Sequence, residues 1–468
     1  MLKDYFLIVS NETGDVFSMH ALVQLLTRRW LEAHGRQETF QQQCIDRLAA
    51  SFPTAEYDNW ETCRRLFPHA QVAFGCQPSE DKMEWASLFH NTGWFARLQG
   101  RYIVAELMTR RALHGCGALE KGQPLSLEWM ADLALILHDQ HRHKEAESLC
   151  SEVLHMREKL LGREHRDTII SVSNLASILS AQGRYQDAER ENRKALEVMQ
   201  KETVFAKDDP DTLNTWSNLA SVLREQGKYH QAETIYQQQL EAMTRRLSRN
   251  HPDTLVCMNN FAWTLQSQAK CKEAELINRQ ALERMEGVFE KKHPTTLTCK
   301  RNLAVILQHR GKSQEAYELS RQVLETAQKE LGEKHRDTLI SCSYVATILE
   351  LQGKFKEAEG RYREVLEGIR GVSGELHPNY LTALANLCNV LRSQGKHDEV
   401  EQIRRQALEM SVKLLGEEHP VTKIFGIDRN TGFSFSWDFS QSLRSGALCG
   451  IGVVLCVYLV LRESRGSF

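Results

Sequence analysis

Apolar residues recur along most of the chain at intervals of three and four positions, the period of an amphipathic helix. One clear stretch carries them at Leu213, Trp216, Leu219, Ala220 and Leu223, and again, after Gly227, at Ala232, Ile235, Tyr236 and Leu240. Each run places its apolar side chains on one helix face. The glycine between the runs can take the left-handed backbone that ends a helix. The pattern therefore predicts two helices joined by a short turn.

This two-helix pattern is repeated. Eight copies are visible between roughly residues 86 and 418, with the turn at Gly100, His141, Gly183, Gly227, Ala269, Gly311, Gly353 and Gly395. The step from Gly183 to Gly227 is 44 residues, and every later step is 42. A single helix pair cannot bury its apolar face, whereas stacked pairs form a continuous core. The expected fold class is all-α, an α-solenoid of about eight helix pairs.

A second recurring motif precedes several first helices. It reads His251-Pro252-Asp253-Thr254 and returns at His293, His335, His377 and His419. Proline suits the first turn of a helix because its missing N–H would be unpaired there, and Asp or Thr can satisfy the free donors. Copies in successive repeats would stand about 10 Å apart, too far to share a metal ion or a proton. We therefore interpret the motif as a helix cap.

The Asn-Leu-Ala core of the first helix, the Gln-Gly-Lys-Tyr turn and the His-Pro-Asp-Thr cap, all at a 42-residue spacing, resemble the tetratricopeptide repeats of kinesin light chains. The resemblance covers about seven-tenths of the chain. It implies a right-handed superhelix whose first helices line a concave surface. It also implies a scaffold or adaptor that binds a protein or an extended peptide.

Asparagines recur at one inward position of the first helix: Asn91, Asn174, Asn218, Asn260, Asn302 and Asn386. An amide both donates and accepts, so such a ladder can hold the backbone of an extended peptide, as the resemblance implies. The alternative is that each asparagine braces the neighbouring helix pair. Asp132 and Tyr344 interrupt the ladder.

Three arginines, Arg224, Arg301 and Arg392, share the inward face with these asparagines. Guanidinium groups bind carboxylates, so the arginines favour an acidic partner. The alternative is that they are solvated surface charges.

The first 75 residues do not follow the repeat. They read as a strand over 5–9, a turn, a returning strand at Val16-Phe17 and a helix from Ala21 to Glu32. The segment around Met19-His20 resembles the winged-helix end of fungal NB-ARC proteins, which are signal-transducing NTPases. No GxxxxGK[ST] loop occurs in the sequence, so we assign no nucleotide to this winged-helix-like remnant and no role to His20.

The other end differs again. A linker is expected over 425–444, followed by an uncharged apolar stretch at 445–461. Its length lies at the short limit for crossing a membrane. The stretch predicts a single-pass tail anchor that holds the chain at the cytoplasmic face of a membrane. The alternative is a buried helix that caps the solenoid in a cytoplasmic protein.

Composition narrows the function. The formal net charge of −2 argues against nucleic acid as a partner, and the twelve cysteines form no CxxC motif for zinc or dithiol chemistry. No nucleophile motif surrounds a cysteine or serine. We therefore expect a scaffold without catalysis, cofactor or metal. The competing hypothesis is a regulatory sensor arm of a truncated NB-ARC NTPase that has lost its nucleotide-binding domain.

Overall fold

The computed structural model describes residues 8–10, 17–19, 21–75, 83–115, 123–140, 142–201, 208–289, 291–373 and 378–415, together with 422 and 425. The predicted linker after Phe425 and the apolar stretch 445–461 lie outside these residues. No helix of the described part is long and apolar enough to cross a membrane.

Two compact units make up the chain, Met1–Leu149 and Cys150–Phe468. The first begins with an antiparallel hairpin of β1 (Ile8–Ser10) and β2 (Phe17–Met19), in which Ile8 lies opposite Met19. The helices that follow are α1 (Ala21–Ala33), α2 (Gln37–Ser51), the 3-10 helix η1 (Tyr57–Asn59) and α3 (Trp60–Phe74). The hairpin and first helix expected from the sequence are confirmed. A winged-helix fold is not shown by these elements.

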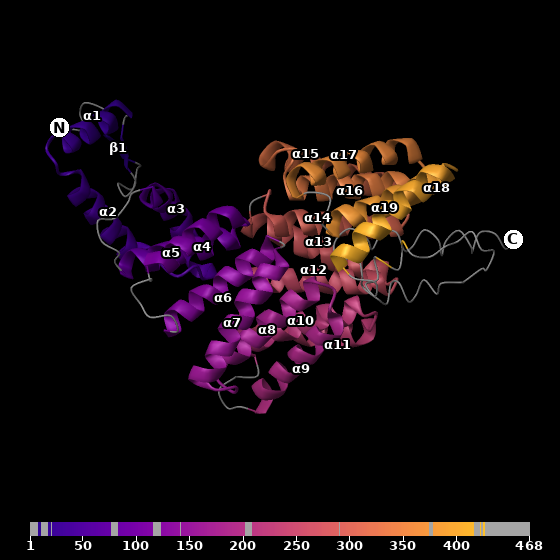
Figure 1. Ribbon diagram of the computed structural model, residues 1–468, viewed down its shortest axis with the longest axis horizontal. Helices are drawn as coiled ribbons and strands as arrows, with labels where there is room; N and C mark the ends of the chain where they lie inside the picture. Colours follow the sequence, from indigo (N-terminus) through magenta and orange to yellow (C-terminus); the bar gives the residue numbers. More distant parts are fainter. Residues whose placement is uncertain are drawn as a thin grey trace. The chain divides into compact units, whose positions relative to one another are not determined.

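The rest of the described chain is a succession of helix pairs (Figure 1). In order they are α4 (Met83–Leu98) with α5 (Tyr102–Gly115), α6 (Pro124–Asp139) with α7 (His143–Leu161), α8 (Arg166–Ala181) with α9 (Tyr185–Lys201), α10 (Pro210–Glu225) with α11 (Tyr229–Arg246), α12 (Pro252–Ser267) with α13 (Cys271–Val288), α14 (Pro294–His309) with α15 (Ser313–Leu331), α16 (Arg336–Leu351) with α17 (Phe355–Ser373), and α18 (Pro378–Ser393) with α19 (His397–Leu415). The predicted all-α solenoid is confirmed.

Small residues allow the two helices of a pair to pack closely. One alanine of the first helix and one of the second recur at fixed distances from the turn, and all are at most 1% exposed: Ala134, Ala176, Ala220, Ala262, Ala304 and Ala346, with Ala105, Ala146, Ala188, Ala232, Ala274, Ala316 and Ala358. In the first pair Gly93 takes the place of alanine, and a Cβ there would lie 2.7 Å from Thr109 Oγ1. The helices therefore touch through their backbones and short side chains.

The recurring His-Pro or His-Arg motif caps the first helices, as predicted. The acceptor, however, is the imidazole rather than Asp or Thr: Nδ1 of His251 accepts from the backbone N–H of Asp253 at 3.3 Å, and His165, His293 and His335 act alike. The threonine hydroxyl points back across the turn, where Thr254 Oγ1 donates to the Ser248 carbonyl at 2.9 Å. The caps expected at His377 and His419 lie outside the described residues.

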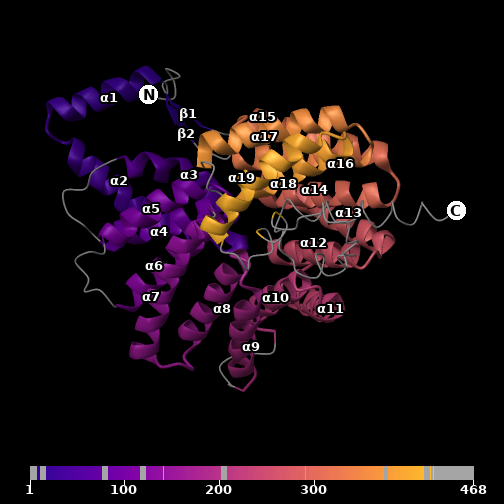
Figure 2. The same cartoon turned by 45° about the vertical axis from the view of Figure 1, so that its right-hand side comes forward.

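Within the second unit the helix pairs follow one another from α8 to α19 (Figure 2). Successive first helices, α8, α10, α12, α14 and α16, contact one another more extensively than successive second helices do. The first helices are therefore the more closely spaced row, and their free side is the inner side of this array. We call it the first-helix side.

Candidate binding surface on the first-helix side

The residue just before the asparagine position of one repeat faces the asparagine position of the next repeat. Asn218 Nδ2 donates to Ser173 Oγ at 3.2 Å, and Asn302 Nδ2 donates to Asn259 Oδ1 at 3.1 Å. The same Asn259 oxygen accepts a hydrogen bond from Asn278 Nδ2 at 3.1 Å, a residue of the second helix. At Asn218 and Asn302 the amide therefore joins adjacent first helices, as the brace interpretation expects.

The two interruptions of the ladder are compensated at the facing position. Asp132, which replaces asparagine, pairs with His90 Nε2 at 2.7 Å. Tyr344, the other replacement, has the Arg301 guanidinium 5.9 Å from its ring centre. The position that holds Ser173 and Asn259 in other repeats thus changes together with its partner.

The remaining asparagines differ in exposure. Asn386 is 1% exposed, and neither of its amide atoms has a hydrogen-bond partner. Asn91, Asn174 and Asn260 are half-buried. Among the described residues, no side-chain hydrogen bond holds the amide of Asn174 or Asn260. These two amides lie on α8 and α12 in the second unit, whereas Asn91 belongs to the first unit.

The three predicted arginines have separate environments. Arg301 is 5% exposed, donates to Thr298 Oγ1 at 2.7 Å and lies 3.7 Å from the Asp337 carboxylate. Arg224 is half-buried and binds the neighbouring Glu225 carboxylate at 2.7 Å. Arg392 is exposed and donates to Asn389 Oδ1 at 3.3 Å. The structure does not bring the three into one cationic site.

The first-helix side changes character along the array. Over α8, α10 and α12 it presents half-buried polar residues, including Asn174, Asn218 and Asn260. From α12 to α16 it is filled by a cluster of buried apolar side chains: Trp263, Val305, Ile340 and Tyr344. The open polar part of the first-helix side therefore lies on α8, α10 and α12.

Near the buried apolar cluster in sequence, burial raises the pKa of Glu350 to about 7, although the Tyr362 hydroxyl at 3.3 Å opposes the shift.

A set of contacts between repeats was not anticipated from the sequence. The glutamine of the turn donates its amide N–H to the carbonyl of the first residue in the preceding second helix, at 3.0–3.1 Å: Gln140 to Tyr102, Gln226 to Tyr185, Gln268 to Tyr229, Gln352 to Ser313 and Gln394 to Phe355. The lysine of the same turn bridges to a glutamate of that helix, as Lys228 does to Glu189 at 2.7 Å. The sequence did contain a signal for these contacts, because Gln, Lys and Glu recur with the repeat.

Burial suppresses the nucleophilicity of three of the described thiols. Desolvation raises the pKa of Cys150, Cys257 and Cys299 to about 12, so each is a neutral thiol at pH 7. In the part of the chain that the structure describes, no three His, Cys, Asp or Glu residues are grouped to hold a metal ion.

Stacked helix pairs, with small residues at seven of the eight crossings, define a helical repeat protein. A family model, the tetratricopeptide repeat, matches residues 126–201, 211–287, 294–370 and 341–413, which is more than half of the chain. The chain belongs to the tetratricopeptide repeat family.

Individual similarities are more distant. A nucleotide-binding leucine-rich repeat (NLR)-like protein of Hyaloscypha variabilis is 33% identical over 116 residues, which is 24% of this chain and 12% of that protein. The nearly identical TPR-like repeats of a kinesin light chain-like protein of Podosopora anserina are 23% identical, with a TM-score of 0.38 over 45% of this chain and 99% of that one. A Rap protein complexed with competence and sporulation factor is 14% identical, with a TM-score of 0.49 over 73% and 95%. Family membership rests on the repeat match alone.

Proposed function

We propose that the chain is a non-catalytic scaffold that binds an extended peptide segment of a partner protein on the first-helix side of α8, α10 and α12. The observation that carries the proposal is the pair of amides at Asn174 and Asn260, which are half-buried and unengaged by other described side chains. An amide matches the alternating donors and acceptors of a peptide backbone. Tetratricopeptide arrays suit this role because their stacked pairs form an extended surface.

The environments of the three arginines bear on whether an acidic partner is expected. Glu225 neutralises Arg224, and Arg301 is buried against Asp337. Only Arg392 of the three is exposed, and it lies on α18, well along the chain from the open amides. Recognition is therefore proposed to depend on the peptide backbone more than on acidic side chains.

The test is a selection of random peptides displayed on phage against the full chain, followed by fluorescence anisotropy with synthetic copies of the enriched peptides. Changing Asn174→Ala and Asn260→Ala together should weaken binding by about fivefold or more, because two hydrogen bonds are lost. The melting temperature should stay within a few degrees of the parent. Enriched peptides that bind the double variant as tightly as the parent would remove the proposal.

Asn302→Ala is the matched control. Asn302 is 7% exposed and its amide is bonded to Asn259, so the change should lower the melting temperature and leave the affinity of the folded array unaltered. A large loss of affinity in this variant, without a loss of stability, would instead place the peptide further along the array.

A second candidate function is a sensor arm in NLR-type signalling. It is favoured by the similarity to the NLR-like protein of Hyaloscypha variabilis, of which the match spans 12%. The genomic sequence upstream of the first codon decides the matter. An in-frame GxxxxGK[ST] loop there supports the sensor arm, and an intergenic region with its own promoter contradicts it.

The apolar stretch 445–461 is proposed to tether the scaffold to a membrane. Its 17 uncharged residues are just long enough to span the hydrocarbon core. The full chain should pellet with membranes and resist carbonate extraction, and a chain ending at residue 439 should be released. Recovery of the full chain in the carbonate-soluble fraction would leave the capping-helix alternative.

A further inference from the structure

A groove lies on the other side of the open repeats, between the second helices α9 and α11. Two adjoining cavities, of about 680 Å³ and 540 Å³, share Gln200, Trp216, Ile235 and Gln238 in their lining. Because the cavities share these residues, they form one elongated depression, which we call the α9–α11 groove. All of its lining belongs to the second unit.

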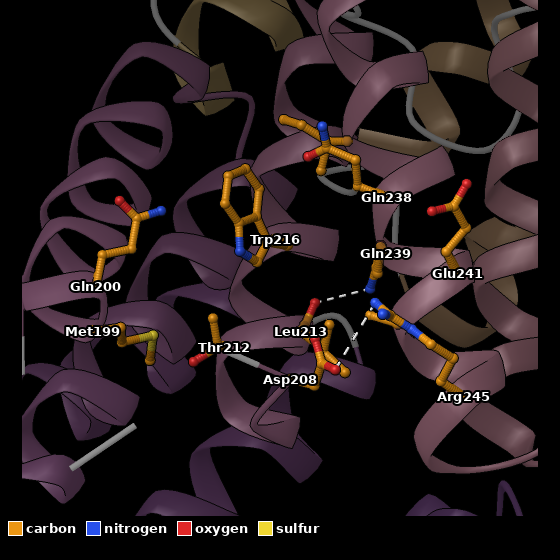
Figure 3. Close-up of a pocket in the computed structure, with 12 residues that line it drawn as sticks. Met199, Gln200, Asp208, Thr212, Leu213, Trp216, Gln238, Gln239, Glu241 and Arg245 are labelled. Carbon is orange, nitrogen blue, oxygen red and sulfur yellow. Dashed lines mark hydrogen bonds and ion pairs between the residues drawn. The ribbon is translucent and has the colours of Figure 1, made fainter. Parts of the chain in front are cut away.

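The floor of the groove is apolar and its walls carry amides. Trp216 of α10 lies between Gln200 of α9 and Gln238 of α11 (Figure 3). Trp216 is half-buried, whereas both glutamines are exposed. An indole presents a large flat apolar surface, and amides donate and accept hydrogen bonds. This combination suits a ligand with a polar backbone and an apolar side chain.

One buried residue breaks the rule that the other repeats follow. Twelve residues after each turn position, the second helix carries a buried Ala or Val in seven of the eight repeats: Ala112, Val153, Ala195, Ala281, Val323, Val365 and Ala407. At this position the fourth repeat has Gln239, which is 2% exposed. A buried amide in place of an aliphatic side chain costs free energy unless both ends are hydrogen-bonded.

Only one end of Gln239 is satisfied. Its Nε2 donates to the Leu213 carbonyl at 2.8 Å, while its Oε1 is buried without a hydrogen-bond partner. Gln239 lines the groove, so its unpaired acceptor lies just beneath the surface that an occupant would cover. A buried acceptor that lacks a partner in the free protein is a reason to look for a ligand.

Charge on the groove restricts the occupant. Glu197, Asp208 and Glu241 are offset by Arg193 and Arg245, and Arg245 lies 3.9 Å from Asp208. Three carboxylates along the lining disfavour a phosphate backbone, and the near balance of charge gives no strong attraction to a charged peptide. The charge pattern fits a neutral segment.

We propose that the α9–α11 groove binds a neutral extended peptide, which places a large apolar side chain on Trp216 and donates a backbone N–H to Gln239 Oε1. This is a second binding surface, separate from the amides of the first-helix side. The scaffold therefore holds two peptide segments at once, one on each side of α10.

Gln239→Ala is the decisive variant because it installs the residue that three other repeats of the second unit carry at this position. The array should fold as the parent does, with a melting temperature within a few degrees. The probe is the same phage-displayed random peptide library, selected against the full chain. Among the enriched peptides, one class should lose about three- to tenfold in affinity on Gln239→Ala and about thirtyfold on Trp216→Ala.

This class should bind the Asn174→Ala, Asn260→Ala double variant as tightly as it binds the parent, which separates the two surfaces. If the enriched peptides respond to the asparagines alone, or if nothing is enriched, the groove proposal is overturned. Sedimentation of the full chain tests the remaining candidate occupant of the groove, a second copy of the chain. A dimer that Gln239→Ala dissociates would assign the groove to a second copy of the chain and would also overturn the proposal.

Discussion

Adjacent first helices are joined through one pair of facing positions, and several different residue pairs occupy it. Ser173 faces Asn218, Asn259 faces Asn302, and His90 faces Asp132. All three are hydrogen-bonded pairs, and each joins two successive repeats at the equivalent position. The sequence showed the asparagines as a ladder, but it could not show which of them have a partner, because the partner changes identity from one repeat to the next.

At Arg301 the facing position holds a charged residue, so replacing Arg301 tests the brace between first helices. Changing Arg301→Ala should lower the free energy of unfolding by about 3 kcal/mol, since the buried Asp337 carboxylate then loses its ion pair. Arg392→Ala is the control, because Arg392 is exposed and should change stability by less than about 0.5 kcal/mol. Urea denaturation of both variants measures the difference. Equal midpoints would show that Arg301 is not part of a brace.

Glu350 gives the array a pH-dependent stability. Burial raises its pKa in the folded chain to about 7, so between about pH 4.5 and 7 the folded state keeps a proton that the unfolded state has released. The free energy of unfolding therefore falls as pH rises through this window and stays lower above it. Glu350→Gln should be more stable than the parent by about 2–3 kcal/mol at pH 8. At pH 4.5 the two should be nearly alike, and a difference that is the same at both pH values would contradict the assignment.

The turn between the two helices of a pair depends on a left-handed residue. Glycine supplies it in most repeats, with φ of 77° at Gly227 and 76° at Gly353, but the fifth repeat uses Ala269 at φ 62°. The alignment of the repeats predicted this substitution at the turn position. The strain that follows from it is visible only in the backbone.

Ala269→Gly should therefore stabilise the array by up to about 1 kcal/mol, because the left-handed conformation costs an alanine about that much. The reciprocal change, Gly353→Ala, should destabilise it by a similar amount. Thermal melts of the two variants in the same buffer provide the comparison. Shifts of the same sign would mean that the turn conformation does not decide the effect.

At the scale of the whole molecule, the helix pairs were predictable because apolar period, glycine turn and alanine crossings repeat at a constant step. The binding surface was less predictable from the sequence. Burial separates Asn302 and Asn386 from Asn174 and Asn260, although all four share one repeat position. Gln239 was missed for the opposite reason: it departs from the pattern at a buried position, and a search for recurring residues passes over a single exception.

The central claim is that the first-helix side of α8, α10 and α12 binds a peptide backbone. A crystal structure of the chain with one of the enriched peptides that responds to the double asparagine variant tests it most directly. The account predicts that the amides of Asn174 and Asn260 lie within about 3.2 Å of backbone N or O atoms of the peptide. A peptide seated elsewhere, with both amides still facing solvent, would contradict it.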